Sequence, residues 1–341
     1  MSSSLPTKMK AWLYTSTSGG LEKNLYFDSS ARAPPSPRPN DVLVQVLFAS
    51  INPADYKVPA MAFGLAAKLV VGLPASPGMD FCGRVIATGA NVSQFTSGQL
   101  VFGCHSQPVK FGSLAEYLSI SADLIAAVPG GVSPGDAATI GIAGQSAFQA
   151  ITGYVKEGDK VFINGGSGGC GLFEIQIAKN LGCHVTATCS TRNVELCREF
   201  GADEVIDYTT VPNGDLSAAL RERGVVFDHI FDHVGLPYDL YFQCHHFLKP
   251  SGVFLQVGAS GMSTHVSRVG WPSILGGGRR KYRIFFFANT RAHVVAIGEM
   301  LQKKSLKVNV DTEYTFEDAV KAFEKLCSGR ARGKILIRVA E

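Results

Sequence analysis

The sequence lacks several features that would each define a class of protein. Its 341 residues contain no stretch of about eighteen uninterrupted apolar residues, so we expect no membrane-spanning helix. Basic residues form no run longer than Arg279-Arg280-Lys281, and the formal net charge is only +4, so nucleic acid is not expected as the main partner. No apolar segment of the kind found in secretory signals follows the Ser-rich residues 1–10.

The eight cysteines include no C-x-x-C pair. Scattered cysteines in a chain of this size are typical of reduced thiols in an intracellular compartment, and we expect a cytoplasmic protein. The one Cys/His cluster, Cys244-His245-His246, has adjacent residues whose side chains would point in different directions. We interpret this cluster as structural and expect no bound metal ion.

Short apolar runs separated by glycine and proline fill the first part of the chain, for example 9–14 and 42–48. Such strands without long helices predict a compact, barrel-like β domain over roughly the first 130 residues. The pattern then changes: Ser133 as cap and Pro134 as the first helical residue predict a helix, and a second helix is expected over 144–155.

From Lys160 onward, strands and helices alternate, which is typical of βαβ units and a parallel sheet. The expected strands are 161–164, 184–189, 204–206, 227–232, 253–257 and a closing strand 284–288. Helices are then expected over 292–303 and 316–327, with a last strand over 334–339. The fold class is therefore α/β, a β-rich domain interrupted by a dinucleotide-type α/β domain.

The segment 161–171 reads V-F-I-N-G-G-S-G-G-C-G, an apolar strand followed by a glycine-rich turn. Gly166, Gly168 and Gly171 fit the pattern G-x-G-x-x-G, and 172–181 is expected to be a helix. A helix N-terminus after such a turn offers free backbone N–H groups to a pyrophosphate. The candidate pyrophosphate-binding residues are Gly166, Ser167, Gly168, Gly169, Cys170 and Gly171. Alternatively, the glycines only allow the helix to pack closely on the sheet.

The end of the strand 184–189 indicates which nucleotide the chain prefers. Ser190-Thr191-Arg192 follows this strand, about twenty residues past the last glycine, where an NAD-preferring site would place Asp or Glu. A hydroxyl and a guanidinium suit a 2′-phosphate instead, so Ser190 and Arg192 predict NADPH. In the alternative interpretation, Ser190 is only a helix cap and Arg192 a solvated residue. Tyr208, at the end of the next strand, is a further candidate for contact with the ribose phosphate.

Four motifs together resemble the medium-chain dehydrogenase/reductase superfamily, in its zinc-free quinone oxidoreductase branch. The motifs are Asn52-Pro53-Ala54-Asp55, Gly166-Ser167-Gly168-Gly169-Cys170-Gly171, Gly201-Ala202-Asp203-Glu204-Val205-Ile206-Asp207-Tyr208 and Gly333-Lys334-Ile335. The match runs from about Lys10 to the C-terminus. Within the branch, the run from His184 to Asn193 is similar to plant chloroplast-envelope quinone oxidoreductase homologues, and fungal trans-acting enoyl reductases are a more distant likeness.

The resemblance implies a GroES-like catalytic domain made of residues 1–132 and 289–341, with a Rossmann domain over 133–288. It also implies NADPH-dependent reduction of the activated C=C bond of α,β-unsaturated carbonyls or quinones by hydride transfer, on a small-molecule substrate and in a possible homodimer. Zinc-dependent relatives place a Cys where this chain has 52–55 and a His-Glu pair where it has Met79-Asp80. Neither ligand is present, so we expect a zinc-independent enzyme.

Without a metal ion, the carbonyl oxygen of an enone needs a positioned donor as negative charge builds on it. Lys57, on the turn that faces the cleft in the family, is the first candidate, with Tyr56 and Tyr14 as weaker ones. Asn52 is expected to order the turn and to touch the nicotinamide or its ribose. The alternative for Lys57 is an ordinary solvated lysine.

The resemblance also implies further cofactor contacts, at Ser146, His233, Val234, Val257, Gly258 and Lys334. Phe285, Phe286 and Phe287 are candidates for a wall of the cleft. The alternative is the core of the sheet, which we expect for two of the three, because alternate side chains of a strand face opposite sides. Two other functions stay open: a trans-acting enoyl reductase that serves a carrier-bound polyketide, and a non-catalytic NADPH-binding sensor or structural protein.

Overall fold

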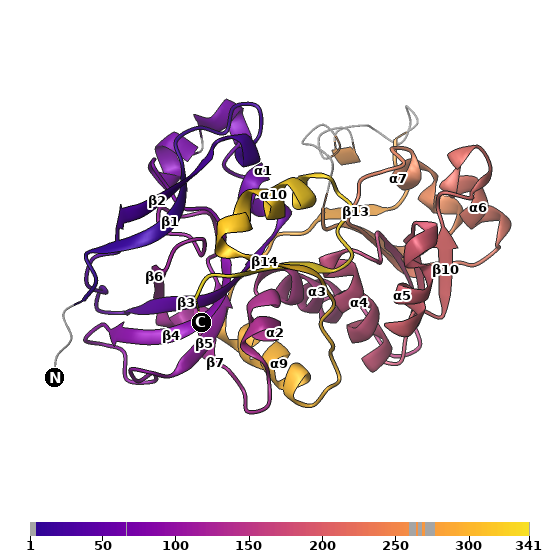
Figure 1. Cartoon of the computed structure of the whole chain (residues 1–341). Helices are drawn as coiled ribbons and strands as arrows, with labels where there is room; N and C mark the ends of the chain where they lie inside the picture. The colour runs from indigo at the N-terminus through magenta and orange to yellow at the C-terminus, as the bar shows by residue number, and fades with distance from the viewer. Residues whose placement is uncertain (1–4, 66, 259–263, 265–267, 270–276, 341) are drawn as a thin grey trace. The chain divides into compact units, whose positions relative to one another are not determined.

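The structure is a computed structural model that describes residues 5–65, 67–258, 264, 268–269 and 277–340 (Figure 1). Its internal contacts divide the chain into two compact units. Unit 1 comprises Met1–Gln145, Ala288–Lys304 and Val308–Glu341, and unit 2 comprises Ser146–Phe287 and Ser305–Lys307. The first division falls inside helix α3 (Ile142–Thr152), not near residue 133 where the sequence pattern changes.

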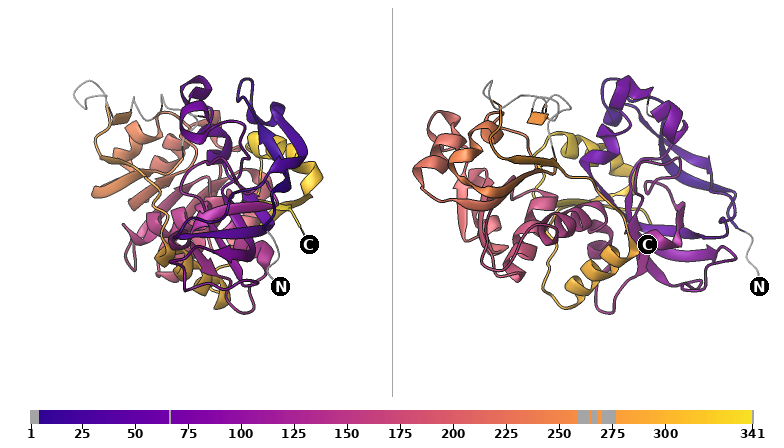
Figure 2. Two further views of the ribbon diagram at one scale, coloured as in Figure 1. Left: turned by 90° about the vertical axis from the view of Figure 1, so that its left-hand side faces the viewer. Right: turned by 180° about the vertical axis from the view of Figure 1, so that it is seen from behind.

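Unit 1 is built on a seven-stranded sheet to which both ends of the chain contribute. Its strands are β3 (Asp41–Ile51), β4 (Asp80–Thr88), β5 (Leu100–Cys104), β6 (Tyr117–Ser121), β7 (Ile125–Ala127), β14 (Val310–Thr315) and β15 (Lys334–Arg338). They follow the order β14-β15-β3-β4-β5-β7, with β6 also paired to β3. The last strand, β15, runs antiparallel to β3, so a yellow segment from near the end of the chain pairs with a strand from its first third (Figures 1 and 2).

A separate antiparallel pair, β1 (Lys8–Tyr14) and β2 (Leu25–Arg32), belongs to the same unit. Helices α1 (Pro53–Lys57), α2 (Pro134–Thr139), α9 (Arg291–Gln302) and α10 (Ala319–Cys327) complete it. In α10, residues 319, 322, 323 and 326 are buried, the i, i+3, i+4, i+7 spacing of a helix with one apolar face. The expected cap of α2 is confirmed, since the Asp136 N–H donates to Ser133 Oγ at 3.0 Å.

Unit 2 contains a six-stranded, fully parallel sheet, as alternating strands and helices predict. Its strands are β8 (Lys160–Asn164), β9 (His184–Cys189), β10 (Glu204–Asp207), β11 (Phe227–Asp232), β12 (Leu248–Gln256) and β13 (Lys281–Ile284). Helices α4 (Gly169–Asn180), α5 (Val194–Glu199), α6 (Leu216–Glu222) and α7 (Leu240–Gln243) connect them. The order β10-β9-β8-β11-β12-β13 is that of a dinucleotide-binding fold, and it reverses between β8 and β11.

The prediction of a closing strand over 284–288 is wrong in its position, and the prediction that two of its phenylalanines are buried in the core is wrong as well. The strand is β13, and the chain leaves the sheet after the Phe285 N–H bonds the Gln256 carbonyl at 2.9 Å. Phe286 is 80% exposed, and Phe285 and Phe287 are only partly buried. The physical reason is that β13 is an edge strand that pairs with β12 alone, so no further strand covers the outer edge of the segment that follows it.

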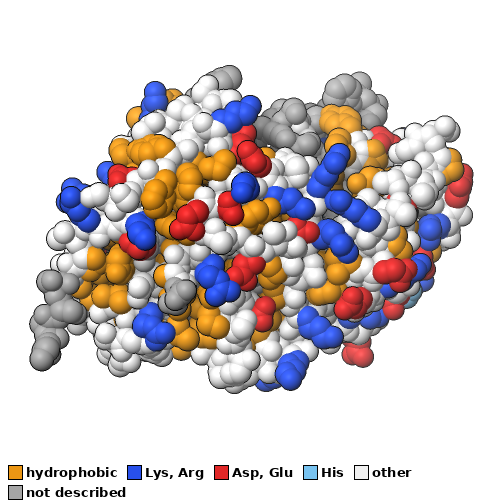
Figure 3. All heavy atoms as spheres, in the orientation of Figure 1, with side chains coloured by type: hydrophobic (Ala, Val, Ile, Leu, Met, Phe, Trp, Pro, Cys, Tyr) orange, Lys and Arg blue, Asp and Glu red, His pale blue; other side chains and the backbone are white. Residues whose placement is uncertain are grey.

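The expectation that His245 and His246 point apart is also wrong. Their ring centroids lie 4.0 Å apart, because rotation about the side-chain torsions brings adjacent rings together although their Cα–Cβ bonds diverge. None of the helices in the described ranges is long and apolar enough to cross a membrane. Acidic and basic side chains are both spread over the face seen in Figure 3.

Candidate functional site: a dinucleotide loop and two buried polar clusters

The glycine-rich turn of unit 2 has the geometry of a phosphate cradle. Gly165 directly follows β8 and has a φ of +91°, a conformation that favours glycine. A Cβ on Gly171 would lie 2.4 Å from the Gly165 carbonyl oxygen, so helix α4 approaches the turn more closely than any larger residue allows. The N–H groups in the first turn of α4 have no acceptor within the helix. The turn therefore fits a pyrophosphate.

The structure brings the candidate nucleotide reader next to this loop. Ser190 and Arg192 lie in the turn after β9, where Arg192 is exposed. Asn193 donates from Nδ2 to Ser167 Oγ at 3.0 Å and to Ser190 Oγ at 3.3 Å. One amide therefore connects the glycine-rich loop to the turn that carries Ser190. The Ser190 side chain makes no capping hydrogen bond, which removes the main support for its interpretation as a helix cap. Sequence reasoning missed Asn193.

The neighbouring strand end is ordered by Asp207. Its carboxylate accepts from the Thr209 N–H at 2.9 Å and from Thr209 Oγ1 at 2.6 Å, and the hydroxyls of Thr191 and Thr209 lie 2.9 Å apart. Hydrogen bonds from Thr191 and Thr209 lower the pKa of Asp207. Tyr208, the candidate for contact with the ribose phosphate, lies between Asp207 and Thr209 in the chain and is 52% exposed.

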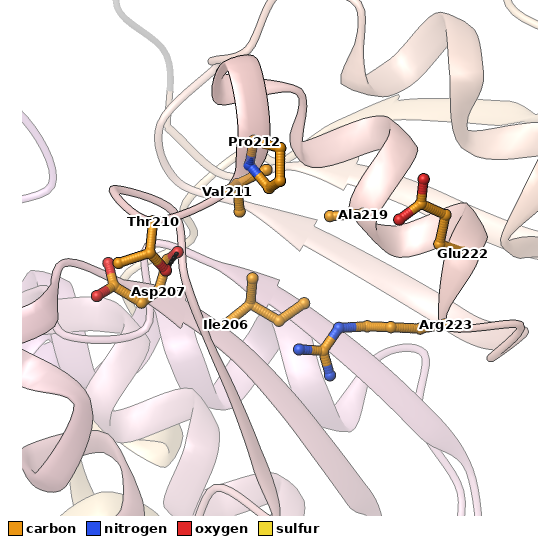
Figure 4. A pocket seen from close by; sticks show the side chains of 8 residues that line it. All are labelled: Ile206, Asp207, Thr210, Val211, Pro212, Ala219, Glu222 and Arg223. Atoms are coloured by element: carbon orange, nitrogen blue, oxygen red, sulfur yellow. Dashed lines mark hydrogen bonds between the residues drawn. The ribbon is translucent and has the colours of Figure 1, made fainter.

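A surface hollow adjoins this strand end (Figure 4). Its lining residues are Ile206, Asp207, Thr210, Val211, Pro212, Ala219, Glu222 and Arg223. The hollow includes none of the candidate cofactor residues.

A buried ion pair holds the carboxyl ends of β8, β11 and β12. The side chains of Arg268 and Asp232 are fully buried and lie 2.9 Å apart, and Asn164 Nδ2 donates to Asp232 at 2.9 Å. Asp232 also accepts from the backbone N–H groups of 234 and 235, and its carbonyl accepts from those of 257 and 258. The expected nicotinamide-side residues Val234, Val257 and Gly258 are therefore positioned by one aspartate that sequence reasoning did not select.

Cys170, Glu174 and His233 form a compact group beside the glycine loop. Cys170 and Glu174 are one turn apart on α4, and His233 directly follows β11. His233 Nε2 lies 2.6 Å from Glu174 Oε2, the Cys170 side chain is hydrogen-bonded to His233, and the three potential ligand atoms lie within 4.8 Å of one another. The i, i+4 spacing on α4 was the only sequence signal for Glu174.

The group is electrostatically unusual because Glu174 is fully buried. Its Oε1 atom has no hydrogen-bond partner among the described residues. Burial lowers the pKa of His233, but Glu174 and Cys170 outweigh that effect and raise it well above its usual range. Burial also raises the pKa of Glu174, although the charge of His233 and its hydrogen bond oppose the shift. The group therefore holds an imidazole with a raised pKa between a buried carboxyl group and a thiol.

Unit 1 carries a second buried polar cluster, at the start of α1. Asn52 precedes this helix, and its N–H donates to Asp55 Oδ2 at 2.6 Å. Asn52 Nδ2 donates to Asp80 Oδ2 at 2.8 Å, and Lys334 Nζ donates to Asn52 Oδ1 and, at 3.3 Å, to Asp80 Oδ2. The structure thus joins Asn52 and Lys334, two candidates that are 282 residues apart, by a direct hydrogen bond. Both also contact Asp80, which sequence reasoning did not select.

Two carboxyl groups share this cluster with one lysine. Burial and the nearby Asp80 raise the pKa of Asp55 to about 8. Burial also raises the pKa of Asp80, although Lys334, Asn52 and the Ile142 N–H oppose the shift. Tyr14 is buried, and burial together with Asp55 raises its pKa to about 12, which makes it a poor proton donor.

The same cluster occupies the position where the family resemblance places zinc ligands. Asp80 already accepts from Asn52, Lys334 and the Ile142 N–H, and the last of these bonds is 2.8 Å long. The positive charge beside the carboxylate is the Lys334 ammonium group. The hydrogen-bonded groups of this cluster are an amide, a carboxylate and an amine. Burial and Asp80 raise the pKa of the nearby Cys104 thiol, which accepts a hydrogen bond from Gln145 Nε2.

The candidate donors on α1 are arranged differently. Lys57 is exposed, its Nζ lies 6.0 Å from the ring centroid of Tyr56, and partial burial of the amine lowers its pKa while Cys327 opposes the shift. Burial raises the pKa of Tyr56. Among the cofactor candidates, Ser146 on α3 is buried.

Comparisons with known proteins identify the family. Residues 38–130 match the alcohol dehydrogenase GroES-like domain, and residues 200–337 match the zinc-binding dehydrogenase family. The chain is 40% identical to a trans-enoyl reductase of Aspergillus terreus, over 100% of this chain and 99% of that protein. It is 27% identical to a chloroplastic quinone-oxidoreductase homologue of Spinacia oleracea, over 96% and 98%. A quinone oxidoreductase from Coxiella burnetii has the same fold, with a TM-score of 0.85, 29% identity and coverage of 98% and 100%.

The chain belongs to the medium-chain dehydrogenase/reductase superfamily, whose enzymes use a nicotinamide dinucleotide. Within it, the chain is an oxidoreductase of the zinc-free quinone oxidoreductase branch. The sequence motifs rank the two likenesses in the wrong order, since the fungal relative shares 40% identity and the chloroplastic one 27%. Short motifs report the loops around the cofactor, whereas overall identity also counts the rest of the chain.

Proposed function

We propose that the protein is an NADPH-dependent, zinc-independent reductase of activated C=C bonds in α,β-unsaturated carbonyls and quinones. The observation that carries the proposal is the buried cluster of Asn52, Asp80 and Lys334, which replaces a zinc site in a chain similar to an enoyl reductase over its whole length. An enzyme of this family without a metal Lewis acid suits substrates that are already electrophilic. The relatives named as enoyl reductase and quinone oxidoreductase act on such substrates.

The loop from Gly166 to Gly171 would hold the pyrophosphate of the cofactor, which supplies the hydride when it is bound. Negative charge then develops on the carbonyl oxygen of the substrate, and a hydrogen-bond donor at that oxygen lowers the barrier. Lys57 is our first candidate for this donor and Tyr56 the second. The lowered pKa of Lys57 supports its choice, because a less basic amine transfers a proton more readily. Solvent then supplies the proton at the α-carbon.

The preference for NADPH rests on the turn after β9. It carries Ser190 and Arg192, and the acidic residue nearby, Asp207, accepts hydrogen bonds from Thr191 and Thr209. A hydroxyl and a guanidinium can bind a 2′-phosphate, with the guanidinium supplying charge-assisted hydrogen bonds. We therefore assign Ser190 and Arg192 to the 2′-phosphate and Asn193 to the support of Ser190.

Arg192→Ala tests this assignment by the ratio of affinities for NADPH and NADH. A charge-assisted hydrogen bond contributes about 1.5–3 kcal/mol, so the ratio should fall roughly tenfold or more. Arg198→Ala is the matched control, since Arg198 is an exposed arginine of α5 that pairs with Glu195 at 2.7 Å. An unchanged ratio in Arg192→Ala, or an equal fall in the control, contradicts the assignment.

The fungal relative supports a second candidate substrate, an enoyl thioester carried by a polyketide carrier domain. The chemistry at the double bond is the same, so the experiment varies what is attached to it. NADPH oxidation is measured with quinones, short free enones and enoyl groups on a small thiol or on a carrier domain. Turnover only on the carrier favours the second candidate. NADPH binding without oxidation by any of these compounds indicates a non-catalytic protein.

A further inference from the structure

Cys170 differs from the other cysteines of the chain in its surroundings. Six of the eight are buried, Cys327 is exposed, and Cys170 is partly exposed. Cys170 alone combines access to solvent with a hydrogen bond to a histidine that is itself bonded to a buried carboxylate. It also lies in the first turn of α4, whose N-terminal dipole favours negative charge. These are the surroundings that stabilise a thiolate.

The spacing of the group fits proton sharing better than metal binding. His233 Nε2 and Glu174 Oε2 are 2.6 Å apart, the length of a strong charge-assisted hydrogen bond. Two atoms that each lie about 2.0–2.2 Å from a tetrahedral zinc ion are separated by more than about 3 Å. The carboxylate therefore orients and charges the imidazole, and the imidazole faces the thiol, as in enzymes with an activated nucleophile.

We propose that Cys170 is a nucleophilic thiol, activated by His233 and Glu174, that adds to α,β-unsaturated carbonyl compounds and is covalently modified by them. In the reactive ion pair the proton of the thiol lies on His233, and Cys170 is a thiolate. The Sγ atom forms a bond to the β-carbon, and the π electrons of the C=C bond move to the carbonyl oxygen. His233 gives its proton to the resulting enolate, which yields a saturated thioether. Nothing is oxidised or reduced and no group leaves, so the step needs no further reactant.

The position of Cys170 connects this modification to cofactor binding. Cys170 lies between Gly169 and Gly171 in the loop that we assign to the pyrophosphate, so this part of the inference rests on the proposed function. A thioether on Cys170 occupies space at the loop, and a bound cofactor covers the thiol. Reactive enones in the absence of NADPH would therefore block cofactor binding, and NADPH would protect the enzyme from them.

The direct test is the rate of labelling of each cysteine by N-ethylmaleimide, itself an activated C=C compound. The protein without cofactor is labelled at pH 6 and the adducts are located by peptide mass spectrometry. An activated thiol reacts faster because more of it is present as thiolate, but a less basic thiolate is also a weaker nucleophile. We therefore expect the labelling rate of Cys170 to be about tenfold that of an ordinary thiol. Free N-acetylcysteine at the same pH is the reference for an ordinary thiol, and Cys170 should react about tenfold faster than it. Cys327, with Glu22 3.6 Å from its sulfur, is the second accessible thiol of the chain.

Solvent exposure and chemical activation predict opposite orders of labelling for Cys170 and Cys327. Partial burial and Glu22 raise the pKa of Cys327 to about 11, although its side chain is the more exposed one. Exposure alone would make Cys327 react first, whereas the inference requires Cys170 to react at least about tenfold faster. Labelling of Cys327 before Cys170 overturns the inference.

The supporting residues are tested in a Cys327→Ser background. Glu174→Gln keeps the shape of the side chain but removes its charge, and His233→Asn removes the imidazole that faces the thiol. Each should slow the labelling of Cys170 severalfold. A variant that merely loosens the fold would expose buried thiols and speed labelling, so a structural effect has the opposite sign. Rates that are unchanged or increased in both variants overturn the roles of Glu174 and His233.

Saturating NADPH should slow the labelling of Cys170 at least tenfold and leave Cys327 unaffected. Cys170→Ser should abolish the fast adduct. Labelling without cofactor does not depend on whether the protein reduces any substrate. A fast Cys170 in a protein that oxidises no NADPH therefore contradicts the proposed function alone, and a slow Cys170 in an active reductase contradicts this inference alone.

Discussion

Asp55 should make the stability of unit 1 depend on pH in an unusual direction. Its pKa is raised from 3.8 to about 8 by burial and by Asp80. The folded protein therefore holds a proton on this group over a range in which the unfolded chain has lost it. Because the folded state binds more protons between these two values, the contribution of Asp55 to stability falls as the pH rises from about 4 to about 8. Most surface carboxylates with lowered pKa values act in the opposite sense.

The size of the effect follows from the width of this range. Each unit of pKa difference corresponds to about 1.4 kcal/mol, so the three pH units between 5 and 8 give about 4 kcal/mol as an upper limit. Local rearrangement and water entry reduce such values, and we expect about 2–4 kcal/mol. In a domain of this size, 1 kcal/mol shifts the melting temperature by roughly 2–4 °C.

Asp55→Asn is the perturbation that isolates this group. The amide has the shape of the protonated acid, its oxygen can accept the Asn52 N–H, and its nitrogen takes the place of Oδ1. The variant should melt within a few degrees of the wild type at pH 5 and at least about 4 °C above it at pH 8.5. Differential scanning calorimetry at both values gives the comparison.

The control is Asp123→Asn, which changes an exposed carboxylate of the same unit. Its melting temperature should follow that of the wild type at both pH values. If Asp55→Asn and the wild type stay equally far apart from pH 5 to pH 8.5, the buried carboxyl does not hold its proton and the reasoning fails. A wild type that gains stability over the variant with rising pH refutes it more strongly.

Two further expectations concern a donor and an ion pair. Lys57→Ala should lower the rate on an enone severalfold or more at saturating NADPH, whereas Lys321→Ala, an exposed lysine of α10, should not; a smaller effect at Lys57 removes its donor role. Arg268→Met should destabilise unit 2 by about 3–5 kcal/mol in urea denaturation, because it leaves Asp232 buried and unpaired, and adding Asp232→Asn should recover part of the loss. Equal losses in the single and double variants would contradict the pairing.

The fold could be predicted well from the sequence because its signals are local. The parallel strands of unit 2 alternate with helices at regular spacing, and β9 and β11 begin and end where the apolar runs do. The cap of α2 is likewise a local pattern around Ser133. The segment 284–288 failed because an apolar run of phenylalanines indicates burial only when other elements cover it.

Site residues that belong to a sequence motif could be predicted, but the residues that hold them in position could not. Gly171 and Ser190 stand at fixed distances along the chain, so spacing finds them. Asn193, Asp232 and Glu174 act through contacts with residues that other elements bring near. An asparagine in a turn or a glutamate in a helix is most often solvated, and nothing in one sequence separates the buried cases from the exposed ones.

Three buried carboxylates show that the residues missed by sequence reasoning matter for function. Asp80, Asp232 and Glu174 are each fully buried, and each holds a candidate site residue in place: Lys334, Val234 and His233 respectively. A buried charge costs free energy unless its partners compensate it, so such residues indicate positions where the fold maintains a particular arrangement of donors. Among these three carboxylates, Glu174 lacks a complete set of hydrogen-bond partners, since its Oε1 atom has none among the described residues. A carboxylate kept in that state beside His233 and Cys170 adds little to stability, and its charge acts on the imidazole and, through it, on the thiol.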